Sequence, residues 1–473
     1  MNHETVRGQI LIQVVIYGAI AALFIGALVL WAGINIRASR QAYYREEAIQ
    51  IAEAGIDYYR WHLAHAPADY QDGTGVPGPY VHDFRDKDGN IIGQFTLEIT
   101  PPMIGSTIVR IKSTGETDAA QGVTRSIETR LAKPSFAKYA WVLNSFVFFG
   151  SAAEVFGPIH SNDGLRFDGL AHNIVTSARD QFDDPDHSGG NEFGVHTHDS
   201  PTDPLPPAAV PSRPDVFEVG RQFPVPATDF AGITADLAEI KADAQASGYY
   251  FAASGALGYH IVLRTDDTFD LYRVNALVPP PSGCSNSTTG WGTWSIQTLG
   301  ETLLQNYPFP ANGLVFVEDH VWVSGQINSG RITIASGRFP DNPATRTNVI
   351  VNNNLLYTNY DGQDAVALIA QGNFNVGLRS ENDLRIDAAI IAQNGRVGRF
   401  SYSSSSCGVE RSRAQLTAYG MLGSFGRPAF AYSSSNGYQA RTYIYDANLL
   451  YGPPPSFPLT SDQYQILSWD EVR

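Results

Sequence analysis

The stretch DQFDDPDHSGGNEFGVHTHD (residues 180–199) contains the side chains best suited to binding a metal ion. Carboxylates in a glycine-containing loop favour calcium, whereas an HxH pair favours zinc or another transition metal. The stretch lacks the ordered spacing of an EF-hand or a zincin, so the default interpretation is a solvated acidic loop. We therefore expect no cofactor and keep calcium as an alternative. The weak candidate ligands are Asp183, Asp184, Asp186, His196 and His198.

Two further groups invite a catalytic interpretation. His160 lies beside Ser161 and Asp163 in GPIHSNDG, but neighbours on one turn rarely reach the geometry of a catalytic triad. A structural corner is the favoured interpretation. In DLRIDAA, alternation places Asp383, Arg385 and the second aspartate, Asp387, on one face of a strand, as a polysaccharide-active enzyme would need. Because no partner strand with matching carboxylates is evident, we expect no enzyme.

The chain has two cysteines, Cys284 and Cys407, both in serine-rich polar segments. They could form one long-range disulfide in an oxidising compartment or remain two unrelated thiols. Two thiols without CxxC spacing do not predict a zinc site. The net charge of −15 and the absence of a basic run argue against nucleic acid as a partner.

The elements that would position these groups are mostly short strands. After Pro134 the chain reads as apolar runs of four to six residues ended by Gly, Asn or Asp, as in GLVFVEDHVWVSGQINSGRITIASG. This texture predicts a β-helix or solenoid-like domain over residues 135–473, with a twisted sandwich as the alternative. Within it, residues 200–215 predict a proline-rich loop and residues 227–247 a surface helix.

The N-terminal region predicts one long helix over residues 9–66. No charged side chain occurs between Ile10 and Ile34, which is long enough to cross a membrane. Beyond it the helical pattern continues to Pro67, with Ala48, Ala52, Ile56, Tyr59 and Leu63 on one face. Residues 67–134 then alternate as a small antiparallel sheet that this apolar face would cover.

This N-terminal helix resembles that of type IV pilins and pseudopilins, particularly PilX-type minor pilins. The resemblance lies in Arg7-Gly8 before the apolar run, in the half-amphipathic helix and in the stretch AIQIAEAGIDYY. It implies that residues 1–8 are a leader removed by a prepilin peptidase after Gly8. Most pilins have glutamate at the fifth mature position, whereas this chain has Gln13. Gln13 would therefore be an altered assembly position.

The segments GPIHSNDGLRFDG and DLRIDAAIIAQNG are similar to those of pilin-like bacterial surface proteins with β-helical coils. We therefore expect a mainly β protein with a long N-terminal helix, a pilin-like sheet and a β-helix-like domain. Its function would be assembly into a type IV pilus-like apparatus, or display and adhesion, with the C-terminal domain outside the cytoplasm. The expected partners are other pilin-like subunits, the inner membrane, a prepilin peptidase and a surface ligand. The alternatives are an uncleaved signal anchor and a surface-anchored polysaccharide-active enzyme.

Overall fold

The computed structural model describes residues 5–230, 232–284 and 292–472, and they form two compact units. The smaller unit combines residues up to 101, residues 109–132 and the C-terminal residues from 463, and the larger combines residues 102–108 and 133–462. The predicted organisation, a long helix with an antiparallel sheet followed by a larger β domain, is confirmed.

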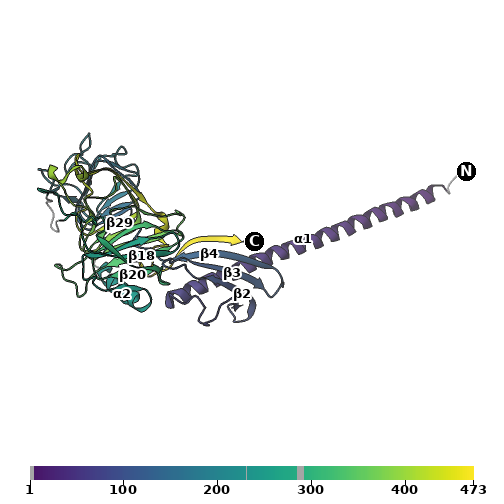
Figure 1. The fold of residues 1–473 in the computed structure, drawn as a ribbon. Coiled ribbons are helices and arrows are strands. Elements are labelled where there is room, and N and C mark those ends of the chain that lie inside the picture. Colours follow the sequence, from purple (N-terminus) through teal and green to yellow (C-terminus); the bar gives the residue numbers. More distant parts are fainter. Residues whose placement is uncertain (1–4, 231, 285–291, 473) are drawn as a thin grey trace. The chain divides into compact units, whose positions relative to one another are not determined.

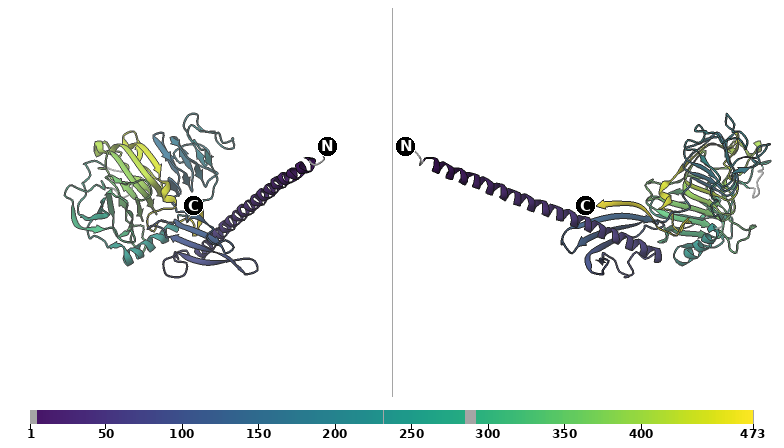
Figure 2. Two further views of the ribbon diagram at one scale, coloured as in Figure 1. Left: turned by 90° about the vertical axis from the view of Figure 1, so that its right-hand side faces the viewer. Right: turned by 180° about the vertical axis from the view of Figure 1, so that it is seen from behind.

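The smaller unit is built on one helix, α1 (Thr5–His65), which passes Arg37 without a break. Its side chains from Ile10 to Tyr43 are almost all exposed. Figures 1 and 2 show this half of α1 standing clear of the sheet that its other half covers. The helix ends just before Pro67, since proline cannot continue the backbone hydrogen-bond ladder.

The second half of α1 packs on a sheet with strand order β1-β2-β3-β4-β32, antiparallel throughout. The helix contributes the predicted stripe from Ala48 to Leu63 to a core that includes Phe95, Ile111 and Ile127. Helix and sheet approach most closely at Gly115, where an added Cβ would lie 2.1 Å from the carbonyl oxygen of Ala48. The strands are β1 (Tyr80–Arg85), β2 (Ile91–Thr100), β3 (Val109–Thr117), β4 (Thr124–Ala132) and β32 (Gln465–Val472).

Strand β32 departs from the predicted boundaries, which place residues 135–473 in one domain and residues 67–134 in the sheet. The structure instead returns the chain's end to the smaller unit, where β32 pairs antiparallel with β4. Pairing satisfies the backbone groups along an edge of β4 that would otherwise be open. Strand β1 lies within the predicted sheet region, and its Tyr80, His82 and Phe84 alternate toward the more buried side.

The larger unit is dominated by parallel ladders of short strands, the kind of pairing that the predicted solenoid-like domain requires. In the longest ladder, inward side chains stack in a column that includes Ile334, Leu368, Ile390 and Leu422. Its strands, in spatial order, are β16 (Tyr249–Phe251), β20 (Leu314–Val317), β22 (Arg331–Ser336), β25 (Ala365–Ala370), β27 (Asp383–Ala392), β29 (Ser412–Ser424), β5 (Trp141–Leu143), β8 (Ile159–Ser161), β11 (Val175–Ser177) and β15 (Arg221–Gln222).

Two more parallel ladders complete the stack. One contains β24 (Leu355–Leu356), β27, β29, β31 (Asn436–Tyr445), β7 (Ala153–Phe156) and β10 (Leu170–Ala171). The other contains β17 (Gly258–Leu263), β21 (Val321–Gln326), β23 (Val349–Ile350), β26 (Phe374–Val376) and β28 (Val397–Arg399). Smaller elements flank them: β6 (Val147–Phe149), β9 (Leu165–Phe167), β12 (Gln181–Phe182), β13 (Glu192–Phe193), β14 (Val195–His196), β18 (Thr268–Val274), β19 (Glu301–Pro308), β30 (Ala431–Ser433) and three short 3-10 turns at Ser405–Cys407, Val409–Arg411 and Ala447–Leu450.

The stack does not follow the order of the chain. Strand β29 pairs with β5, so Leu422 lies directly beside Trp141. The ladder that starts at β16 and runs to β29 is therefore extended by strands that come earlier in the chain, namely β5, β8, β11 and β15. Helix α2 (Gly232–Ser247) is shorter than the predicted 227–247 and lies in the segment between β15 and β16, the two ends of the longest ladder. Its Leu237, Ile240 and Ala244 are buried against the strands. Figure 1 shows it beside β20.

Candidate functional site

The exposed half of α1 is the first candidate. Among the described residues, one helix is apolar enough over a sufficient length to cross a membrane. Large side chains along it, such as Leu23 at 74% exposure and Trp31 at 65%, have no protein core to cover them. Gln13 is exposed on this half, and Gly8 lies one turn earlier in the same helix, while Met1–Glu4 of the predicted leader lie outside the described residues. Such a surface requires an apolar environment, either lipid or other helices.

The second candidate is a cluster of two histidines and two carboxylates in the larger unit. The antiparallel pair β12–β13 brings Phe182 opposite Glu192, so the loop after β12 places Asp184 close to Glu192. Strand β14 carries His196, and the extended chain after it places His198 on the same side. Ligand atoms of Asp184, Glu192, His196 and His198 all lie within 4.8 Å of one another.

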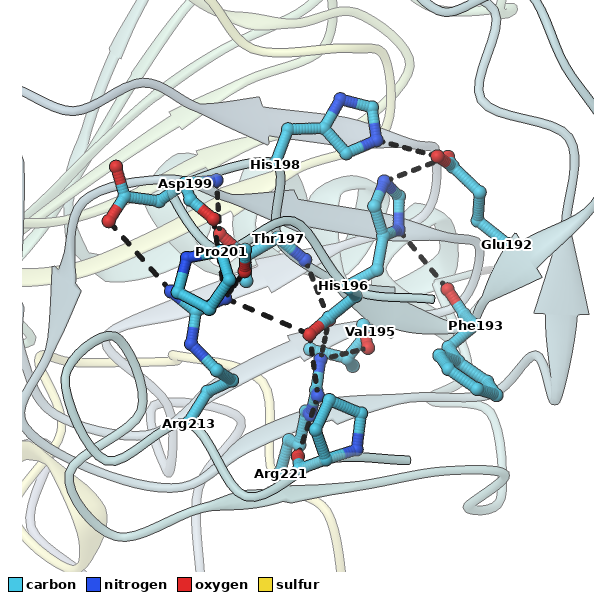
Figure 3. A network of polar contacts seen from close by, with 12 residues as sticks. Glu192, Phe193, Val195, His196, Thr197, His198, Asp199, Pro201, Arg213 and Arg221 are labelled. Atoms are coloured by element: carbon cyan, nitrogen blue, oxygen red, sulfur yellow. Dashed lines mark hydrogen bonds and ion pairs between the residues drawn. The ribbon is translucent and has the colours of Figure 1, made fainter. Parts of the chain in front are cut away.

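The distances within this cluster are short and its side chains are largely buried. Glu192 Oε2 lies 2.9 Å from His196 Nε2, and Glu192 Oε1 lies 2.5 Å from His198 Nε2. Asp184 Oδ2 lies 3.5 Å from His196 Nε2. The side chains of His196 and Asp184 are 1% and 0% exposed, and that of His198 is 13% exposed. Figure 3 shows the two imidazoles directed at the Glu192 carboxylate.

Hydrogen bonds fix how two of these side chains are turned. His196 Nδ1 lies 3.2 Å from the Phe193 carbonyl oxygen, which can only accept, so Nδ1 carries a proton. Asp184 Oδ1 accepts from the Asp186 backbone N–H at 2.8 Å. Burial lowers the pKa of His196, and this outweighs the opposite influence of Glu192 and Asp184. The neutral imidazole thus presents the Nε2 lone pair to the carboxylates.

The backbone that carries the histidines is held by charged side chains (Figure 3). Arg221 Nη1 donates to the Val195 carbonyl oxygen at 2.9 Å and also contacts Asp203. Asp203 Oδ2 accepts from the Thr197 N–H at 3.0 Å, and Asp168 Oδ1 accepts from the His198 N–H at 2.8 Å. These bonds fix the segment at both histidines, so the arrangement is preorganised.

The structure divides the five weak metal candidates. Asp184, His196 and His198 come together, whereas Asp183 is exposed and Asp186 pairs with Arg427. Glu192 is the member that the candidate set left out. A signal was present, because Glu192 precedes His196 by four residues in the same short segment, but only the β12–β13 pairing turns it toward the histidines.

The residues with a catalytic interpretation serve the fold. His160 is buried, stacks on Tyr139 and bonds to Thr176 and Asn162 at 3.0 Å each, and burial lowers its pKa. These contacts hold the chain where it turns after β8, and the structural-corner interpretation stays a prediction. Asp387 is buried and accepts from Tyr360 Oη at 2.8 Å and from Arg385 Nε at 2.9 Å.

Cys284 and Cys407 form a disulfide across 123 residues of sequence, with their Cα atoms 4.5 Å apart. Both are buried in a small cluster with Leu378, Phe400 and Tyr402. Of the two interpretations that the sequence left open, the structure has the bonded one. The bond ties the segment before β19 to the 3-10 turn at Ser405–Cys407.

The larger unit also has an open groove of about 910 Å³ beside β6 and β30. Arginines and aromatic rings line it, including Phe148, Arg166, Arg427 and Tyr432. Arg166 lies over the Phe148 ring at 4.3 Å, and Arg427 over the Phe146 ring at 4.6 Å. Stacked guanidinium groups and exposed rings are suited to polar, planar or sugar-like ligands.

Comparison with known proteins yields little. No protein-family model matches the chain, and no curated protein matches it. Among solved structures, the competence-associated pilin ComZ from Thermus thermophilus is similar over 91% of this chain and 98% of that chain, at 12% identity and a TM-score of 0.29. A TM-score this low does not establish a common fold.

Proposed function

We propose that this chain is a membrane-anchored, pilin-like protein that assembles with other pilin-like subunits and displays its larger β unit outside the cytoplasm. The observation that carries the proposal is the division of α1. Its first half is apolar and exposed, and its second half is buried on a five-stranded antiparallel sheet. A helix needs about 20 apolar residues to cross the hydrocarbon core. The same surface can pack against identical halves of other subunits when it leaves the lipid.

Gln13 makes the proposal more specific. It lies on the exposed half of α1, five residues after Gly8, where pilins with the same leader carry glutamate. An amide can accept a hydrogen bond but carries no charge. It would therefore pair less strongly with the terminal amine of a neighbouring subunit. We infer a minor subunit, added at few positions, and not the main building unit of a filament.

We propose that the groove of the displayed larger unit contacts a ligand, and we propose no catalytic role. A glycosidase requires two carboxyl groups that converge on one cleft. Here Asp387 is buried beneath Tyr360 and Arg385, whereas Asp383 is exposed at the start of β27. By contrast, the groove offers arginines and rings on its surface. Contact with an anionic or sugar-like surface ligand is the use that this lining favours.

The decisive experiment is mass spectrometry of the mature N-terminus in cells with and without a prepilin peptidase. We expect cleavage after Gly8 only where the peptidase is present, and Gly8→Val should remain uncleaved. Gly18→Val is the matched control, because an added Cβ there meets no atom within 4 Å. Normal processing of Gly8→Val would contradict recognition of Gly8 by the peptidase, whereas an intact Met1 in both strains would favour an uncleaved signal anchor.

A second measurement addresses assembly. We expect Gln13→Glu to increase the amount of this protein in sheared surface filaments, because it restores the charge that pairs with a neighbour's terminal amine. Gln13→Ala should lower it or leave it unchanged. Equal amounts of Gln13→Glu and wild type in the filament fraction, at equal expression, would contradict a role for this position in assembly.

A further inference from the structure

We infer that Asp184, Glu192, His196 and His198 form a binding site for one divalent transition-metal ion, with Zn²⁺ as the ion whose ligand preferences the site fits. The site lies in the larger unit and does not depend on the proposed membrane and assembly role. Zinc is bound by imidazole nitrogen and carboxylate oxygen in four-coordinate sites, and this cluster supplies two of each.

Unpartnered atoms are the first observation that points to a ligand. Among the described residues, Asp184 Oδ2, Glu192 Oε2 and His196 Nε2 are all buried and none has a hydrogen-bond partner. The 2.9 Å approach of Glu192 Oε2 to His196 Nε2 is close but not aligned as a hydrogen bond. A buried polar atom without a partner loses its hydrogen bonds to water and gains none in the protein, so it destabilises the fold. Three such atoms directed at one point are best explained by a cation between them.

The spacing agrees with a small ion. Ligands at about 2.0–2.2 Å from zinc in a tetrahedron lie about 3.3–3.6 Å from one another. Asp184 Oδ2 and His196 Nε2 are 3.5 Å apart. The two Glu192–histidine contacts, at 2.9 and 2.5 Å, are tighter and would open by up to about an ångström to reach this spacing.

Outer hydrogen bonds already orient the ligands. His196 Nδ1–H donates a hydrogen bond to the Phe193 carbonyl oxygen, which leaves Nε2 directed inward. Asp184 uses Oδ1 to accept from Asp186 N–H, which leaves Oδ2 directed inward. Metal-bound histidines almost always donate their other N–H in this way. The same two contacts would be an unusual coincidence in a solvated acidic loop.

The donor set also decides between metals. Calcium takes six to eight oxygen ligands, whereas imidazoles select zinc and other transition metals. Two carboxylates balance the charge of a divalent cation. Arg166 Nη1 lies 3.8 Å from Asp184 Oδ2, but the guanidinium group binds Asp168 more closely, through Nη2 at 2.6 Å. With four protein ligands the ion would be structural, fastening the β12–β13 hairpin to β14.

The test uses the full chain in detergent, stripped with EDTA and titrated with Zn²⁺ alone, with Ca²⁺ in a parallel sample. We expect one Zn²⁺ per chain by elemental mass spectrometry after desalting, and no displacement by excess Ca²⁺. X-ray absorption of the zinc-loaded wild type should show imidazole scattering from two histidines. An absence of retained zinc, or a spectrum without imidazole, would overturn the site without any variant.

Variants then locate the ion. His198→Gln changes the more exposed of the two histidine ligands, at 13% exposure, and we expect Zn²⁺ to bind at least ~10-fold more weakly, since even outer-shell changes cost about 10–100-fold. The matched control is His172→Gln, since His172 also contacts two carboxylates, Glu154 and Glu218, but through opposite ring nitrogens. Equal affinity of His198→Gln and wild type, or equal loss in His172→Gln, would contradict the assignment.

Discussion

The two units of this protein are built in opposite ways from similar strands. In the smaller unit β1 to β4 pair with their chain neighbours, and only β32 arrives from far away. In the larger unit most strands pair with a strand of another coil, and the seam between β29 and β5 joins residues more than 270 positions apart, since Leu422 pairs with Trp141. Because β1 to β4 pair with their chain neighbours, the sheet of the smaller unit can be predicted from the order of its strands in the sequence. Distant pairing makes the largest hydrophobic cluster of the larger unit continuous across this seam, since Trp141 and Leu422 both belong to it.

The seam provides the strongest test of this difference. Trp141 is 1% exposed and packs edge to face against Phe149 and Tyr443. Trp141→Ala should lower the free energy of unfolding of the larger unit by about 3–5 kcal/mol, because it leaves a cavity at the junction. Hydrogen exchange by mass spectrometry should show faster exchange in β5, β8 and β29 and unchanged exchange in β2–β4.

Trp61→Ala is the control for the seam variant, since Trp61 is a tryptophan on α1 at 60% exposure. It should change stability by less than about 0.5 kcal/mol. If Trp141→Ala loosened both units equally, the larger unit would not have a core of its own.

The disulfide offers a second test, because it spans the larger unit. A cross-link that closes a loop of 123 residues restricts the unfolded chain, which is typically worth about 2–4 kcal/mol. We expect the Cys284→Ser/Cys407→Ser double variant to unfold at a lower urea concentration, with the loss confined to the larger unit. Reduced wild type should match it, and an unchanged midpoint after verified reduction would contradict the expectation.

Short-range patterns explain what could be predicted from the sequence. The helix and its stripe from Ala48 to Leu63 follow from spacing, and β2–β4 follow from alternation. The seam between β29 and β5 could not be predicted, because a three-residue apolar strand such as β5 carries no mark of its partner. The same applies to β32, whose QILSWDEV alternates weakly and whose partner strand lies over 300 residues earlier.

The metal-binding cluster shows the same limit on a smaller scale. The HxH spacing identified His196 and His198, because alternation along an extended chain puts them on one side. Choosing among the neighbouring acids was not possible from composition. Only the β12–β13 register brings Asp184 and Glu192 inward while Asp183 stays exposed.

Low pH should also affect the stability of the two units differently. Burial lowers the pKa of His320 in the larger unit to about 4. Below its ordinary value near 6.5, the unfolded chain takes up a proton that the folded protein does not, so stability falls as the pH drops toward 4. The shift corresponds to about 3 kcal/mol across that window, at roughly 1.4 kcal/mol per unit.

His320→Asn should remove that part of the pH dependence, because an amide oxygen can still accept from the Asn348 N–H but does not titrate. The measurement is the urea midpoint from pH 7 to pH 4 for wild type and variant. If the urea midpoints of wild type and variant fell in parallel with pH, His320 would not be responsible for the loss of stability. The urea midpoint of the smaller unit should depend on pH in the same way in wild type and in His320→Asn.

The contact between helix and sheet tests the smaller unit. A Cβ at position 115 would lie 2.1 Å from the Ala48 carbonyl oxygen and 2.6 Å from the Ala52 nitrogen, both backbone atoms that cannot rotate away. Gly115→Ala should therefore cost about 1–3 kcal/mol and speed exchange in α1 beyond Ala48. Gly33→Ala, where the Cβ meets open space, should not destabilise the helix. Equal exchange in the two variants would mean that α1 does not rest on β3.

The smallest expected effect distinguishes the two faces of a single strand, β3. Thr117 is buried toward α1 and donates from Oγ1 to Glu47 Oε2 at 2.7 Å, whereas Thr114 faces away and contacts Ser126 at 2.8 Å. Thr117→Val should cost about 1–2 kcal/mol, since it leaves a carboxylate without its donor, and Thr114→Val should cost less than about 0.5 kcal/mol. Urea unfolding followed in β3 by hydrogen exchange measures both. A larger loss for Thr114→Val would place the main support of β3 on the face opposite the helix, and the smaller unit would then not owe its stability to α1.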